Sequence, residues 1–64
     1  MPALRYWRIQ RALTQRQLAE RIAVDITTVQ RLERGGAARL STVSRLADVL
    51  QVTPAQLMHE PPEP

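Results

Sequence analysis

Apolar residues recur along the chain at helical spacing, in short segments separated by polar or glycine-containing breaks. The clearest stripe is Val43, Leu46, Ala47 and Leu50, which lie at i, i+3, i+4 and i+7. No stretch alternates apolar and polar residues as a half-buried strand does. The pattern predicts an all-α chain with helices over residues 4–12, 15–22, 26–33, 41–50 and 54–58.

Helix-start signals support three of these segments. Thr14 is a favourable N-cap, and Gln17 three residues later completes a capping box. Asp25 is the N-cap candidate for the next helix. Thr53 precedes Pro54, which places a proline at the first position of the last helix.

The chain has 64 residues and no cysteine, so packing or dimerisation must stabilise it without disulfides or a thiolate metal site. Gly35 and Gly36 are predicted to stop the third helix, and a loop follows. One domain is expected over residues 1–58. Residues 59–64 are rich in proline and have nothing to bury, so this tail is expected to be disordered.

Basic charge is concentrated in the first two thirds of the sequence. All nine basic residues are arginines between Arg5 and Arg45. Residues 1–45 contain three acids and carry a net charge of +6, whereas residues 46–64 carry −3. Such a distribution is typical of a phosphate-binding surface.

No apolar run reaches the roughly 20 residues that span a bilayer, and no leader is visible, so we expect a cytoplasmic protein without a membrane partner.

The predicted helix over 26–33 has two chemically different faces. Val29 and Leu32 point toward the core, with Ile26 at the rim. The opposite face carries no acid and consists of Thr27, Gln30, Arg31 and Arg34. Arginine pairs with guanine in the major groove, glutamine pairs with adenine, and methyl groups contact the thymine methyl. The face therefore favours a helix that reads duplex DNA.

Residues 14–34 have the length of a helix-turn-helix. The motif is carried by Thr14-Gln15-Arg16-Gln17-Leu18-Ala19-Glu20, by Asp25-Ile26-Thr27-Thr28-Val29-Gln30-Arg31-Leu32-Glu33-Arg34-Gly35, and by the stretch from Val43 to Val52. With these spacings, residues 4–58 resemble the Cro/C1-type helix-turn-helix family of phage repressors, also called XRE-like. The resemblance implies a compact five-helix bundle of the lambda-repressor-like type that binds operators, commonly as a dimer.

The resemblance also implies roles for individual residues. Base edges would be contacted by Ile26, Thr27, Gln30 and Arg31. The DNA backbone would be contacted by Gln15, Thr28, Arg34 and Arg39. Arg8 and Glu33 would form an ion pair beneath the recognition helix, and Gln15 would also support that helix.

Three positions depart from the family pattern. Ala12 and Ala23 stand where the family often has glycine at the C-terminal end of a helix. A left-handed alanine costs roughly 1 kcal/mol, so either these turns are reshaped or they carry strain. Ile26 is more apolar than is usual for a base-reading residue, which indicates a contact with a thymine methyl.

The parts needed for catalysis are missing. His59 is the single histidine and lies in the tail without a second ligand, and no paired carboxylates share a predicted face. We therefore expect no enzymatic activity, no metal and no cofactor.

A transcription regulator that binds double-stranded DNA is expected, acting as a repressor and a homodimer. An antitoxin that represses its own operon would use the same chemistry. The alternative is a protein-interaction module that binds a partner such as a toxin, although such a role does not require an acid-free helix face. The subunit contact could involve Met58, or Trp7 with Ile9.

Overall fold

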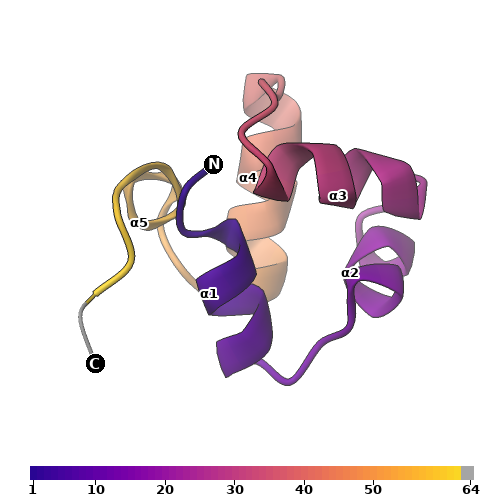
Figure 1. Ribbon diagram of the computed structural model, residues 1–64, viewed down its shortest axis with the longest axis horizontal. Coiled ribbons are helices and arrows are strands. Elements are labelled where there is room, and N and C mark those ends of the chain that lie inside the picture. The colour runs from indigo at the N-terminus through magenta and orange to yellow at the C-terminus, as the bar shows by residue number, and fades with distance from the viewer. Residues whose placement is uncertain (63–64) are drawn as a thin grey trace.

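The computed structural model describes residues 1–62, and this range folds into five helices without a strand. The helices are α1 (Leu4–Gln10), α2 (Gln15–Arg21), α3 (Ile26–Glu33), α4 (Leu40–Leu50) and α5 (Pro54–Met58). In Figure 1, α1 and α4 occupy the middle of the molecule, with α2 and α3 on one side and α5 on the other. The predicted all-α fold with five helices is confirmed.

Most predicted helix limits agree with the structure. The limits of α3 and α5 match the prediction, and α4 begins one residue early, at Leu40. The predictions for the first two helices were too long, since α1 ends at Gln10 and α2 at Arg21. Both helices end early because the chain turns left-handed soon afterwards, at Ala12 (φ 56°) and Ala23 (φ 59°).

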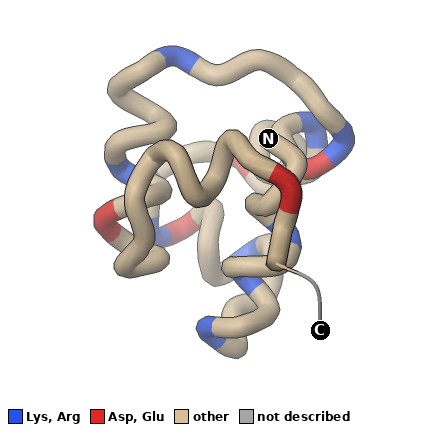
Figure 2. Tube along the Cα trace, turned by 90° about the vertical axis from the view of Figure 1, so that its left-hand side faces the viewer, with Lys and Arg blue, Asp and Glu red and all other residues tan. Residues whose placement is uncertain are grey.

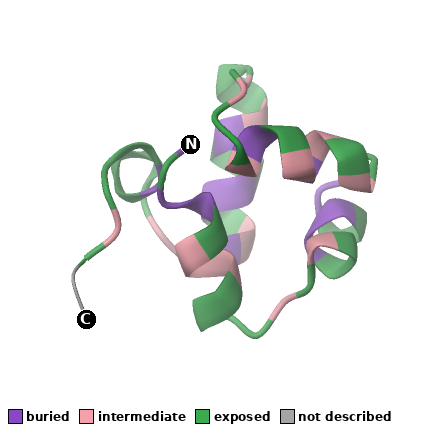
Figure 3. Ribbon diagram, viewed as in Figure 1, coloured by how far each residue is buried: buried purple, intermediate pink, exposed green. Residues whose placement is uncertain are grey.

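The core lies where one face of each helix meets the others (Figure 3). Contacts join α2 to α3, α4 to α5, and α1 to both α3 and α5. The fully buried large side chains are Leu4, Leu18, Val29, Leu32, Leu46, Leu50 and Leu57. Every helix therefore contributes to one apolar cluster, as the helical spacing predicts.

Two of the first three residues are also buried, which the sequence pattern did not indicate, while Pro2 between them is exposed. Met1 and Ala3 are buried. The backbone N–H of Ala3 donates to the Leu57 carbonyl at 3.2 Å, and the Met1 amino nitrogen donates to the Leu32 carbonyl at 3.1 Å. These bonds tie the start of the chain to α5 and to the end of α3.

The predicted capping box at the start of α2 is present. The N–H of Gln17 donates to the Thr14 hydroxyl at 3.0 Å, and the Thr14 N–H donates to the Gln17 side chain at 2.8 Å. Thr53 and Gln56 form a second capping box at α5, which was not among the predicted helix-start signals. Asp25 occupies the N-cap position of α3, but its side chain makes no capping hydrogen bond.

The first four helices end in the same way. After each helix one residue adopts a positive φ, and two backbone N–H groups bond back into the last turn as in a Schellman motif. Only α3 uses glycine there, at Gly35. The other three motifs place Ala12, Ala23 and Gln51 in the left-handed region. The turns thus keep the geometry that glycine normally provides, so they are not reshaped, and the two alanines adopt the left-handed conformation from which strain is expected.

We expect Ala12→Gly and Ala23→Gly each to raise the free energy of unfolding by about 0.5–1 kcal/mol. Glycine removes the left-handed strain, and this gain exceeds the entropy it adds to the unfolded chain. Urea unfolding followed by circular dichroism measures the change. Gly35→Ala is the reciprocal control and should destabilise the domain, because Gly35 has φ +105°. Glycine variants no more stable than the parent would show that these alanines carry no net strain.

Residues 59–62 follow α5 without helix or strand, and residues 63–64 of the expected tail lie outside the described residues. Disorder of the tail stays a prediction.

Among the helices of residues 1–62, none has the length and apolar character needed to cross a bilayer.

Candidate nucleic-acid interface

The side chains of α3 separate into the two faces expected from the sequence. Val29 and Leu32 are fully buried against the core. Thr27 and Arg31 are exposed on the opposite side, and Gln30 between them is half-buried. The outer face of α3 is thus anchored from beneath and open to a ligand.

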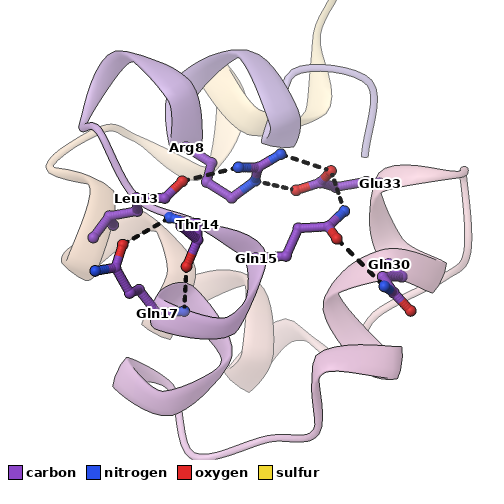
Figure 4. Close-up of polar contacts among 7 residues, drawn as sticks. All are labelled: Arg8, Leu13, Thr14, Gln15, Gln17, Gln30 and Glu33. Carbon is purple, nitrogen blue, oxygen red and sulfur yellow. Dashed lines mark hydrogen bonds and ion pairs between the residues drawn. The ribbon is translucent and has the colours of Figure 1, made fainter.

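A chain of polar contacts holds α3 against α1 and α2 (Figure 4). Arg8 Nε donates to Glu33 Oε2 at 2.6 Å, and Arg8 Nη2 donates to Glu33 Oε1 at 3.3 Å. Gln15 Nε2 donates to the same Oε1 at 3.1 Å, and Gln30 Nε2 donates to Gln15 Oε1 at 3.4 Å. The contacts run from the ion pair beneath α3 to an amide on its outer face.

The ion pair is largely shielded from water. The side chains of Arg8 and Glu33 are 11% and 6% exposed. Arg8 also donates through Nη1 to the Leu13 carbonyl at 2.8 Å, so this guanidinium connects α1, the loop after it and α3. Within residues 1–62, no buried side-chain nitrogen or oxygen atom lacks a hydrogen-bond partner.

Arg31 is folded onto the loop that follows α3. Its Nη1 donates to the Ala37 carbonyl at 2.9 Å, although the side chain is exposed overall. The side chain lines a surface groove between α3, the loop and α4, together with Thr28, Arg39 and Thr42. The groove combines two guanidinium groups with two hydroxyls, a set suited to the oxygens of a phosphate.

The other expected DNA-contacting residues differ in accessibility. Arg34 is the C-cap that follows α3 and Arg39 precedes α4, and both are exposed. Ile26 is half-buried and packs against the core, so only part of its side chain can reach a base. The structure places all of these residues around α3 and its flanking loop.

Several arginines serve the fold. Figure 2 shows the basic positions spread around the trace. Arg11 Nε donates to the Leu50 carbonyl at 2.7 Å, and Arg45 Nη1 donates to the Ile22 carbonyl at 3.3 Å. These cations, like Arg8, satisfy carbonyls at or just beyond helix C-termini, where positive charge is favourable. Among residues 1–62, the arginines without a side-chain hydrogen bond are Arg5, Arg16, Arg21, Arg34 and Arg39.

Three features that shape this surface could not be found from the sequence. They are the Ala37 carbonyl, the Thr42 hydroxyl and the absence of a side chain at Gly36, which leaves space for Arg31. All three depend on how the loop after α3 returns toward α4. Helical periodicity carries no signal for such a path, and only the two consecutive glycines indicated that the chain turns there.

The described part of the chain contains no cluster of three or more residues that could hold a metal ion.

Residues 4–57 match a protein-family model described as helix-turn-helix. No curated protein and no solved structure matches the chain.

Proposed function

The chain belongs to the Cro/C1-type helix-turn-helix family and is a DNA-binding regulator of transcription; from this premise we propose that α3 reads a specific duplex sequence in the major groove. The bound domain would act as a repressor, with two copies on a two-fold symmetric operator. Recognition helices of such dimers lie about one helical turn of DNA apart, roughly 34 Å. Regulation follows from binding alone, and we assign the domain no catalytic step.

The observation that carries this proposal is the outer face of α3. The face holds no acid, and its polar groups come from Thr27, Gln30, Arg31 and Arg34. Arg31 can donate two hydrogen bonds to guanine O6 and N7, and Gln30 can pair with adenine N6 and N7. The methyl groups of Thr27 and Ile26 suit thymine.

Rigid support of α3 strengthens the argument. Gln30 uses one amide hydrogen on Gln15, which leaves its oxygen and its second amide hydrogen for an adenine edge. Gln15 is itself bonded to Glu33, whose partner is Arg8. A reading side chain held in this way loses less conformational entropy when it binds.

Contacts with phosphates would supply most of the affinity and set the register on the duplex. We assign them to Thr28, Arg34 and Arg39, which surround α3, and to Gln15 at the start of α2. None of the acids in residues 1–62 lines the groove beside Arg31 and Arg39, so no negative side chain there opposes an approaching phosphate.

A second candidate function is binding of a protein partner, such as a toxin, on the same scaffold. Exposed apolar side chains at Ile9, Leu40 and Met58 favour it, because they offer apolar contact area to a protein partner. The two functions are compatible in an antitoxin that represses its own operon.

The test is DNA binding as a function of salt, followed by selection of bound duplexes from a random pool. We expect log affinity to fall steeply and linearly with log salt, because bound arginines release counterions. The selected duplexes should share a two-fold symmetric sequence. Binding that is absent or independent of salt would refute DNA recognition and favour the protein partner. Enrichment of asymmetric sites would refute the homodimer.

A further inference from the structure

Gly35 and Gly36 are adjacent, yet the structure requires each of them for a different reason. Gly35 has φ +105°, and a Cβ built on it meets nothing within 4 Å. Gly36 lies outside the left-handed region, but a Cβ built on it would lie 2.7 Å from Arg31 Cγ and 2.8 Å from Arg31 Nη1. Gly35 therefore satisfies the backbone, whereas Gly36 leaves space for the side chain of Arg31.

The space above Gly36 is occupied by the folded form of Arg31. The side chain passes over the glycine, and its Nη1 reaches the Ala37 carbonyl at 2.9 Å. A guanidinium has five N–H donors, so one bond to a carbonyl leaves four for a ligand. The bond thus restricts the orientation of Arg31 and keeps its capacity for a bidentate contact.

We propose that Gly36 is a positioning residue for Arg31: because it has no side chain, Arg31 can lie against the loop in one conformation, bonded to the Ala37 carbonyl, before DNA binds. The inference rests on the proposed function, since it takes the ligand of Arg31 to be DNA. A side chain ordered in advance avoids the entropy cost of immobilisation on binding. Any side chain at position 36 displaces Arg31 from the loop and restores that cost.

Gly36→Ala tests the proposal by a double-mutant cycle. We expect the substitution to weaken binding to the selected duplex by about 2- to 12-fold for each bound subunit, the range that corresponds to immobilising one long side chain. In an Arg31→Ala background the same substitution should change affinity less than 2-fold, because no side chain is left to displace. An equal loss in both backgrounds would overturn the proposal.

Two controls separate positioning from stability. A Cβ at position 36 would also lie 2.9 Å from the Arg31 carbonyl, so Gly36→Ala should lower the melting temperature in both backgrounds. Gly35→Ala should also lower the melting temperature, because of its φ, while the contribution of Arg31 to binding stays unchanged. Gly35→Ala that reduced this contribution as much as Gly36→Ala does would overturn the proposal.

A measurement without DNA distinguishes failure of this inference from failure of the proposed function. In the free wild-type protein, ¹⁵N relaxation at Nε should show Arg31 more ordered than the exposed Arg34. Equal mobility of the two would overturn the positioning role, even if the protein binds DNA. An ordered Arg31 in a protein without sequence preference would support the positioning geometry and refute the reading function instead.

Discussion

Replacing Glu33 by alanine is expected to lower the free energy of unfolding by up to about 3–5 kcal/mol, the cost of leaving a largely buried charge without its partner. Arg8 would lose both bonds to the carboxylate, at 2.6 and 3.3 Å, in a site where its own side chain is 11% exposed. Gln15 would lose its acceptor as well. A domain this small has only about 3–5 kcal/mol from its core, so the variant should be largely unfolded.

Circular dichroism without denaturant measures the folded fraction of Glu33→Ala and Arg8→Ala, and urea unfolding of the parent protein gives the free energy against which this fraction is compared. Glu20→Ala is the matched control, because Glu20 is exposed and its change should stay within about 0.5 kcal/mol. The double variant Arg8→Met with Glu33→Leu should lose less stability than either single variant, since an apolar pair leaves no unpaired charge. A Glu33→Ala protein as stable as Glu20→Ala would show that the ion pair does not hold α3 in place.

Arg31→Ala is expected to weaken binding to the preferred duplex by about 1–3 kcal/mol for each bound subunit and to relax the preference at one base pair of each half-site. The guanidinium is exposed beside α3 and carries free donors for a guanine edge. Arg34→Ala is the comparison. It should weaken preferred and unrelated duplexes alike and reduce the slope of log affinity against log salt by about 1 for each bound subunit, as loss of one phosphate contact does.

Fluorescence anisotropy with the selected duplex, its single-base variants and an unrelated duplex separates the two roles. Because Arg31 also bonds to the loop, thermal unfolding of each variant must show that the domain is still folded. Equal loss on all duplexes for both variants would contradict the division into a base-reading and a backbone-contacting arginine. Arg31 would then belong with Arg39 and Thr28 as part of a phosphate site in the groove.

The sequence predicted the helices well because their signals are local. The spacing of Val29 and Leu32 within α3, and the Thr14–Gln17 capping box before α2, are set by residues within one turn of each other. The same periodicity placed Thr27 and Arg31 on the outer face of α3. The ends of α1 and α2 were predicted less well, because alanine itself favours a helix and only the family resemblance marked Ala12 and Ala23 as positions for a left-handed residue.

The sequence by itself therefore determined an all-helical chain, the position of its helix-turn-helix and the polar, acid-free face of α3. Only the tertiary structure decided which arginines bond to backbone carbonyls and which remain without a side-chain hydrogen bond. Arg11 and Arg45 bind carbonyls that lie 39 and 23 residues away in the sequence, and Arg31 rests on a loop that has no periodic pattern. The physical reason is the separation in sequence of the groups involved. A repeating pattern depends on residues within a few turns and indicates which side of a helix is buried. A guanidinium on a long side chain instead donates to a carbonyl that only the folded chain brings close to it.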